Sequence, residues 1–252
     1  MLTRDDLLHA LAQIHETAPV RADEVTGSTN ATAGAMAEDG APQWTLVATS
    51  HQTAGRGRLG RTWEDVGGRA LLVSVVLRPS LPANRAGLLS LLAGASMATA
   101  IREVAGREAT CKWPNDLLVG GRKVGGILLE SSLRDERLAS VVVGIGVNLE
   151  PPPDVEGAAG IGDVRLRDLL TSFLVRFHGA YEAETPSWEE RVRSAWLPVS
   201  STIGQLVEAT STAGEEVRGR AVGIDEFGGL RLSTDRGEAR VVFGEIAHLG
   251  AG

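Results

Sequence analysis

Three arginines spaced by glycines, Arg56, Arg58 and Arg61, stand in the segment GRGRLGR at residues 55–61. Guanidinium groups bind phosphate through paired hydrogen bonds, and a glycine-rich backbone exposes N–H groups that bind anions in the same way. The spacing therefore predicts a loop that wraps an anionic ligand. A solvated basic loop is the plainer alternative, because arginine is usually exposed, and the segment alone leaves both interpretations open.

The same segment contains GxGxxG, the dinucleotide-binding pattern, which works only where it opens a helix after a strand. The residues that follow, TWEDVGG at 62–68, are too rich in glycine and too aperiodic for a helix. We therefore expect no Rossmann-type nucleotide site here.

A second polar group is formed by KWPND at 112–116 and RKVGGI at 122–127. If the chain turns at Gly120-Gly121, Lys123 lies on an antiparallel strand close to the Asn115-Asp116 turn. A lysine, a carboxamide and a carboxylate then share one pocket. The alternative is a hairpin with a turn-stabilising Asn-Asp pair and an exposed lysine.

Glycines also interrupt two apolar runs, as Gly125-Gly126 in the first and as Gly144 and Gly146 in the second. Side chains alternate along a strand, so two glycines on one face open a slot for a flat ligand, with Asn148 at its end as a hydrogen-bonding group. A β-bulge is the alternative interpretation of these glycines.

The elements that hold these residues are predicted to form a mixed sheet with antiparallel hairpins and flanking helices, rather than a repeating βαβ array. We expect strands at 45–50, 70–77, 109–113, 117–119, 123–130 and 138–148. Helices are expected at 3–14, from Ser28 to Asp39, and at 85–104, 165–181 and 187–196, with a loop at 151–162.

The sequence pattern changes at about residue 201, from long apolar runs to short alternating ones. Short alternating runs at 205–209, 216–223, 229–233 and 239–243 are separated by Gly or Asp turns, which predicts a small all-β barrel. The expected domains are 1–199 for the larger domain and 200–252 for the barrel.

Composition narrows the class of protein. A net charge of −7 and a pI near 5.3 oppose broad nucleic-acid binding, so we expect no nucleic-acid partner. One cysteine, Cys111, predicts a buried thiol in a reducing cytoplasm, and the five histidines lack the spacing of metal ligands. The longest apolar stretch, 88–101, falls short of the ~20 residues that span a bilayer. The first six residues include Arg4, Asp5 and Asp6 and no apolar core, so we expect no signal peptide.

Five segments occur in one order: STN at 28–30, QTAGRGRLGRTW at 52–63, KWPND at 112–116, RKVGGI at 122–127 and GIGVN at 144–148. Together they resemble the motif set of the biotin protein ligase family, over about residues 20–150. The β-rich tail resembles that family's SH3-like C-terminal domain. The resemblance implies an α+β fold, with a mixed or antiparallel sheet flanked by helices, like that of class II aminoacyl-tRNA synthetases and lipoate ligases.

The activity that the resemblance implies is formation of biotinyl-adenylate from biotin and ATP, followed by transfer of biotin to a lysine of a biotin carboxyl carrier protein. ATP would carry Mg²⁺, and no tightly bound metal or protein-only metal site is expected. The implied biotin-binding residues are Ser28, Thr29, Asn30, Gln52, Gly55, Arg56, Gly57, Arg58, Lys123, Gly126 and Gly144. The implied nucleotide-binding residues are Arg58, Arg61, Trp63, Asn115, Asp116, Lys123 and Asn148.

Three residues carry the chemistry in this hypothesis. Lys123 bridges the biotin carboxylate and the α-phosphate, Arg58 contacts phosphate, and Asp116 orients or deprotonates the acceptor lysine. The loops at 56–68 and 151–162 are expected to order over the ligand.

Two features depart from common family members. Residues 64–68, EDVGG, lack the Ser-Pro often found there, and no N-terminal DNA-binding domain is expected, which predicts an enzyme without a repressor role. The rival hypotheses are a lipoate ligase, a non-catalytic ligand-binding module and a nucleic-acid-binding protein. The sequence leaves the oligomeric state open, a homodimer included.

Overall fold

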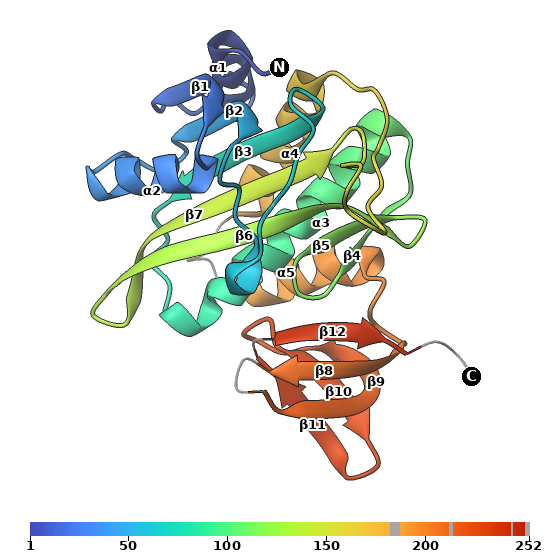
Figure 1. Cartoon of the computed structure of the whole chain (residues 1–252). Helices are drawn as coiled ribbons and strands as arrows, with labels where there is room; N and C mark the ends of the chain where they lie inside the picture. Colours follow the sequence, from blue (N-terminus) through green and yellow to red (C-terminus); the bar gives the residue numbers. More distant parts are fainter. Residues whose placement is uncertain (182–186, 212–213, 243, 250–252) are drawn as a thin grey trace.

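The structure, a computed structural model, describes residues 1–181, 187–211, 214–242 and 244–249. A larger domain carries a mixed sheet covered by helices, and a small antiparallel sheet lies beneath it (Figure 1). The α+β fold expected from the sequence is confirmed.

Seven strands form the larger sheet, in the order β1-β2-β3-β7-β6-β5-β4. Their bounds are β1 Val20–Thr26, β2 Leu46–Gln52, β3 Ala70–Leu77, β4 Ala109–Lys112, β5 Asp116–Val119, β6 Arg122–Arg134 and β7 Arg137–Asn148. β1 and β2 run parallel, and the other neighbours run antiparallel. β1 was not predicted, because this edge strand reads VRADEVT and lacks an apolar run.

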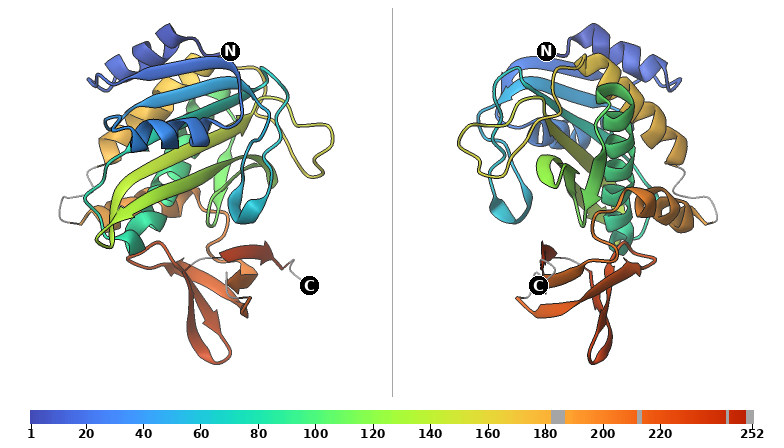
Figure 2. Two further views of the ribbon diagram at one scale, coloured as in Figure 1. Left: turned by 60° about the vertical axis from the view of Figure 1, so that its left-hand side comes forward. Right: turned by 90° about the vertical axis from the view of Figure 1, so that its right-hand side faces the viewer.

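Helices cover both faces of this sheet. α2 (Thr29–Glu38) packs on β2, β3 and β7, while α3 (Ala86–Ala105) packs on the opposite face. α4 (Leu166–Ala180), α5 (Trp188–Trp196) and α1 (Arg4–Ala12) complete the layer of α3. Figure 2 shows α3 and α4 on one side of the sheet and the loops around residues 56–68 and 151–162 on the other.

The strand β3 is buried along its whole length because it is covered from both sides. Val73 and Val75 belong to the main core with α3 and α4, whereas Val76 packs with Ala33 of α2 and Val142 of β7. The continuous apolar sequence ALLVSVVL follows from this double burial.

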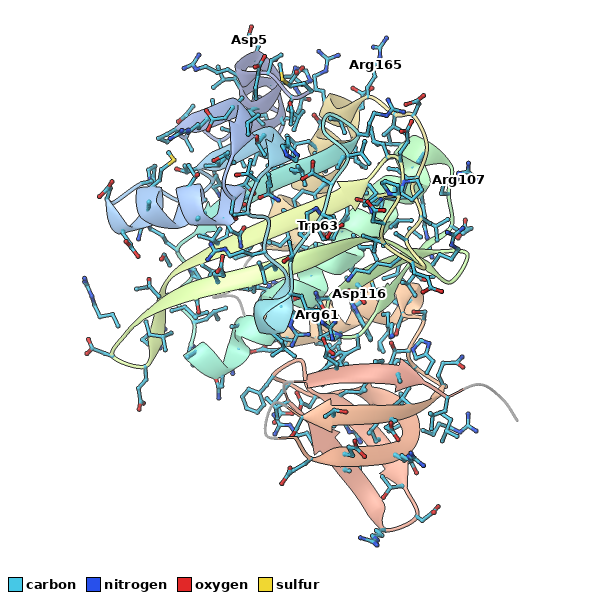
Figure 3. The ribbon with its side chains drawn as sticks, viewed as in Figure 1. Asp5, Arg61, Trp63, Arg107, Asp116 and Arg165 are labelled. Atoms are coloured by element: carbon cyan, nitrogen blue, oxygen red, sulfur yellow. The ribbon has the colours of Figure 1, made fainter. Side chains whose placement is uncertain are left out.

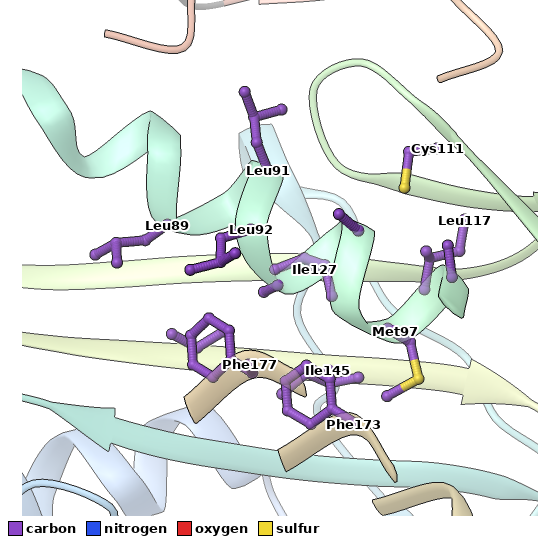
Figure 4. Packing of buried hydrophobic residues seen from close by; sticks show 14 of the residues in the cluster. Leu89, Leu91, Leu92, Met97, Cys111, Leu117, Ile127, Ile145, Phe173 and Phe177 are labelled. Carbon is purple, nitrogen blue, oxygen red and sulfur yellow. The ribbon is translucent and has the colours of Figure 1, made fainter. Parts of the chain in front are cut away.

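Helix α3 forms the centre of the main core, where Leu92 and Met97 pack among Phe173, Phe177 and Ile127 (Figure 4). The span Ala83–Ala105 is long and apolar enough to cross a membrane by length and composition, but 67% of its apolar window is buried inside the structure. Burial in a folded core accounts for that composition. Cys111 lies in the same core at 3% exposure, and burial raises the pKa of its thiol to about 12, so the thiol is unreactive at neutral pH.

Five antiparallel strands form the smaller, SH3-like sheet, in the order β11-β10-β9-β8-β12. Their bounds are β8 Leu206–Ser211, β9 Glu216–Ile224, β10 Leu230–Thr234, β11 Gly237–Val241 and β12 Gly244–His248. β12 was not predicted. Residue 243, the end of the strand expected at 239–243, lies outside the described residues.

Trp113 joins the two domains. Its backbone N–H donates to Oγ1 of Thr202 at 2.9 Å, and its indole Nε1 donates to the carbonyl of Gly228 at 3.0 Å. These contacts hold the small sheet beneath the KWPND turn, with β12 nearest the larger domain (Figure 1).

Candidate active site

A cavity of about 180 Å³ lies where the arginine loop (residues 55–61), the KWPND turn and strands β6 and β7 meet, with β12 along one edge. Fourteen of the sixteen site residues expected from the sequence line it: Ser28, Thr29, Asn30, Gln52, Arg56, Gly57, Arg58, Arg61, Trp63, Asn115, Asp116, Lys123, Gly126 and Gly144. Gly55 and Asn148 are not part of its lining.

One wall of the cavity is a polar network at the N-terminus of α2, where Ser28 caps the helix by accepting from Ala31 N–H. The side-chain oxygen of Gln52 accepts from the backbone N–H of Thr29 at 2.8 Å. The buried Ser74 hydroxyl donates to Oδ1 of Asn30 at 2.6 Å. Fixed, uncharged donors and acceptors of this kind suit recognition of a polar ligand head.

The arginine loop is a short hairpin and not the start of an α-helix, as expected. Gly57 N–H donates to the carbonyl of Arg61 at 2.7 Å, and Trp63 N–H donates to that of Gly55 at 3.0 Å. Leu59 has a φ of 54°, inside a single 3-10 turn. A Cβ on Gly55 would lie 2.4 Å from the Trp63 carbonyl oxygen, so the absence of a side chain at Gly55 permits the hairpin to close.

Four cationic side chains of the cavity are held by neighbouring oxygens. Lys123 Nζ lies 2.6 Å from Oδ1 of Asp116. Arg58 Nη1 donates to Oδ1 of Asn115 and to the carbonyl of Gly244, both at 3.2 Å. The other two pairs join Arg56 to Glu130 and Arg61 to Glu245. Figure 3 shows Trp63, Arg61 and Asp116 gathered on this side of the sheet.

The Arg58 guanidinium is the most strongly desolvated of these cations. Burial lowers its pKa, the carboxylates of Glu245 and Asp116 oppose that effect, and the charge of Arg61 adds to it. Arginine stays charged at any physiological pH, so the desolvated group is a cation that a bound anion would stabilise.

Lys112 belongs to the KWPND motif, but it is not among the site residues expected from the sequence. It lines the cavity on β4, opposite Asp116 of β5 in the strand register, and forms no ion pair with the residues that the structure describes. Lys112 and Lys123 are the only lysines in the 252-residue sequence, and both line this cavity.

Side chains of the protein occupy part of the slot that the alternate glycines of β7 were expected to open. A Cβ on Gly146 would lie 2.7 Å from the Trp63 ring, and one on Gly144 would lie 2.2 Å from Oδ1 of Asn30. A Cβ on Gly126 would lie 3.6 Å from the Asn115 carbonyl oxygen and 3.8 Å from Cε of Lys123, which are ordinary van der Waals distances, so no side chain of the protein overlaps this position.

Two buried polar atoms near this slot have no hydrogen-bond partner among the described residues, Nε1 of Trp63 and Oδ1 of Asn148. Asn148 is only 4% exposed, and its Nδ2 donates to the carbonyl of Ala159 at 3.5 Å. Unpaired buried polar atoms cost free energy, so these two mark a place where a ligand or a shifted loop would gain hydrogen bonds.

The segment 151–162 contains no helix or strand, as expected, and its far end attaches beside the cavity. Ala159 N–H donates to the carbonyl of Lys123 at 2.7 Å, and Ile161 N–H donates to that of Asn148 at 3.0 Å. Whether this loop and the arginine loop reorder over a ligand stays a prediction.

Sequence reasoning missed the contribution of the small domain, because β12 was not predicted and its position depends on how the domains dock. Glu245 and Ile246 of β12 line the cavity together with the apolar residues Leu72, Ile127, Leu128 and Ile145. Glu130, which pairs with Arg56 and accepts from Asn30 Nδ2 at 2.8 Å, was also missed. Among the described residues, no group of three or more His, Cys, Asp or Glu side chains is placed to hold a metal ion.

Comparison with family models matches residues 23–148 to the biotin/lipoate A/B protein ligase family and residues 202–249 to the biotin protein ligase C-terminal domain. The chain is 32% identical over 235 residues to the bifunctional ligase/repressor BirA of Bacillus subtilis, a match that covers 88% of this chain and 72% of the relative. It is 35% identical over 240 residues to the biotin–acetyl-CoA-carboxylase ligase of Paracoccus denitrificans, covering 88% and 97% of the two chains.

Among solved structures, a point mutant of the Aquifex aeolicus biotin protein ligase in complex with biotin superposes with a TM-score of 0.74 at 25% identity. The match covers 92% of this chain and 99% of that chain. The chain therefore belongs to the biotin/lipoate A/B protein ligase family. Its C-terminal domain and these relatives place it with the biotin protein ligases of that family.

Proposed function

We propose that the protein joins biotin to the α-phosphate of ATP, releasing pyrophosphate, and then transfers the biotin to a lysine of a carrier protein. The observation that carries this proposal is the gathering of five cations, Arg56, Arg58, Arg61, Lys112 and Lys123, around one cavity that also has a neutral polar wall. The reaction brings a carboxylate and a polyphosphate together. A site for it must supply positive charge where the two anions meet.

Biotin would bind against the wall formed by α2 and β2. The neutral groups of Ser28, Thr29, Asn30 and Gln52 offer donors and acceptors for a ureido ring, which carries no charge. Gly126, which lines the cavity without a side chain, would leave room for the ring system.

The nucleotide would lie between the arginine loop and the KWPND turn. Arg58 and Arg61 are proposed to contact phosphates, and the Trp63 ring to pack against the adenylate, with Asn115 and Asn148 as further contacts. Without a ligand, Arg58 is bonded to the Asn115 amide and the Gly244 carbonyl, and Arg61 is bonded to the partly exposed carboxylate of Glu245. A polyphosphate carries more negative charge than these groups and would displace them. ATP would arrive with Mg²⁺, which adds positive charge at the departing pyrophosphate.

In the first step, a biotin carboxylate oxygen attacks the α-phosphorus, and the bond from that phosphorus to the pyrophosphate oxygen breaks. Lys123 would turn from Asp116 to the two reacting anions. In the second step, the carrier amine attacks the acyl carbon, AMP leaves with the bonding electrons, and the amine loses a proton. Asp116 is proposed to orient or accept that proton.

The carrier is proposed to belong to a biotin-dependent carboxylase, because a relative covered over 97% of its length is named for acetyl-CoA carboxylase. We propose that the reaction takes place in the cytoplasm and involves no nucleic acid. A single buried cysteine and a net charge of −7 support both proposals.

Incubation with ATP, Mg²⁺ and either biotin or lipoate tests the proposed function. We expect pyrophosphate release and an adenylate, identified by mass spectrometry, with biotin and not with lipoate. Adenylate formation from lipoate alone would replace this proposal with a lipoate ligase. Biotin binding without pyrophosphate release would indicate a ligand-binding module.

A further inference from the structure

Asp65, in the EDVGG segment after the arginine loop, has a fully buried side chain. Its Oδ1 lies 2.9 Å from Nδ1 of His51, and its Oδ2 accepts from the backbone N–H of Gln52 at 3.1 Å. Neither His51 nor Asp65 lines the cavity. A role other than ligand contact must therefore account for the burial of this carboxylate.

Burying a carboxylate is costly unless both of its oxygens find partners. Asp65 meets this condition by joining two adjacent residues of β2, one through a side chain and one through the backbone. The neighbouring segment adds a further contact, because Gly68 N–H donates to the carbonyl of Ser50 at 2.9 Å. The segment that follows the arginine loop is thus hydrogen-bonded to the last three residues of β2.

These hydrogen bonds position Gln52, whose backbone and side chain are both hydrogen-bonded. Asp65 holds its backbone N–H, and the N–H and hydroxyl of Thr29 donate to its side-chain oxygen at 2.8 and 3.2 Å. The remaining carboxamide group, Nε2, has no acceptor among the described residues, and Gln52 lines the cavity. Nε2 is therefore an oriented, free donor at the cavity wall.

We propose that Asp65, which is hydrogen-bonded to His51, is a positioning residue. It holds the arginine loop against β2 and orients Gln52 so that its side chain donates to biotin. This inference rests on the proposed function. It also accounts for the EDVGG segment, which lacks the Ser-Pro of common family members. The loop closure there depends on a carboxylate held by a histidine.

The test uses Asp65→Ala, Asp65→Asn and His51→Ala in the full chain, with Glu64→Ala as the matched control. Glu64 is the adjacent carboxylate, is exposed, and forms no hydrogen bond or ion pair with the described residues. The measurement is biotin-dependent pyrophosphate–ATP exchange, analysed separately for the KM of biotin, the KM of ATP and kcat.

For Asp65→Ala we expect the KM of biotin to rise about tenfold, the effect of about 1.4 kcal/mol, while the KM of ATP stays within about twofold. The biotin KM of Asp65→Asn should stay within about threefold of the wild-type value, because the amide oxygen still accepts from Gln52 N–H and the NH₂ group can donate to the His51 imidazole. The biotin KM of His51→Ala should lie between the values of these two variants. Glu64→Ala should match wild type.

Equal biotin KM values for Asp65→Ala and Glu64→Ala would overturn the inference, as would a parallel rise in the KM of ATP. If Asp65→Ala does not fold, the same comparison is made with His51→Ala, whose side chain is 43% exposed. Its biotin KM should rise above that of Glu64→Ala, and equal values would likewise overturn the inference.

A second measurement needs no activity. Trypsin cleavage after Arg56, Arg58 and Arg61 without ligand should be faster in Asp65→Ala than in Glu64→Ala, and equal rates would contradict the closure. If wild type shows no biotin-dependent exchange, the proposed function fails, while this cleavage comparison still tests the closure.

Discussion

Lys123 is proposed to bridge the two anions of the reaction, and in the ligand-free structure its ammonium group lies 2.6 Å from Oδ1 of Asp116. Replacing it with alanine removes the bridging charge, so biotin-dependent pyrophosphate–ATP exchange should fall at least about 100-fold. The melting temperature should change little, because the side chain is 44% exposed. Arg134→Ala, at the exposed end of the same strand, is the control. Exchange at the wild-type rate would remove Lys123 from the mechanism.

Asp116 is tested separately in the second step. Single-turnover transfer from purified biotinyl-adenylate to the carrier should slow about 100-fold or more in Asp116→Asn at neutral pH, because a carboxamide cannot accept the proton. Adenylate binding should persist. A wild-type transfer rate would end the case for Asp116 as the base.

The candidate site was predicted from residue types and spacing to a large extent. Lys123, Asp116 and Asn115 meet because a Gly120-Gly121 turn forces their strands together, and local sequence encodes that turn. Asn148 is not part of the cavity lining, since strand alternation fixes the face of a side chain but not what the loop above places on that face. Gly55 is not part of it either, because the arginine hairpin closes against this residue.

At the scale of elements, the glycines of β7 make room for the side chains of Asn30 and Trp63. In Gly144→Ala the new Cβ would collide with Asn30, which would break its contact with the buried Ser74. We expect a loss of about 1–3 kcal/mol in the free energy of unfolding, measured by guanidinium denaturation, and a raised KM for biotin.

Gly34→Ala is the matched control for this substitution. Gly34 lies in α2, where no atom stands within 4 Å of an added Cβ, so the change should be neutral or stabilising by up to about 1 kcal/mol. Equal free energies of unfolding for Gly144→Ala and Gly34→Ala would show that the position of the Asn30 side chain does not depend on the space at Gly144.

The central strands and helices were predicted because their apolar runs are long and buried. The edge strand β1 was missed because its polar sequence VRADEVT shows no strand pattern. β12 was missed for a different reason. Its sequence, GEIAH, carries only one large apolar residue, Ile246, and pairing with β8 supplies the rest of its order.

At the scale of the whole molecule, docking of the small sheet brings Glu245 and the Gly244 carbonyl to the arginine loop. No local pattern in the sequence encodes this contact, because it depends on how two folded domains meet. Trp113 fixes the meeting point through the carbonyl of the buried Gly228.

Trp113→Phe removes the indole N–H together with part of the ring system, at a side chain that is only 2% exposed. The unpaired Gly228 carbonyl and the cavity left by the smaller ring should together cost about 2–4 kcal/mol in the free energy of unfolding, measured by urea denaturation. An unchanged midpoint would show that the hydrogen bond contributes nothing to the docking.

The central claim is that the cationic cavity activates biotin for transfer to a lysine. The most direct measurement is mass spectrometry of a biotin carboxyl carrier domain incubated with the protein, ATP, Mg²⁺ and biotin, beside a carrier whose acceptor lysine is replaced by arginine. We predict one biotin on the intact carrier and none on the variant. An unmodified carrier, in the presence of pyrophosphate release that depends on biotin, would contradict transfer, and the absence of both would contradict the account as a whole.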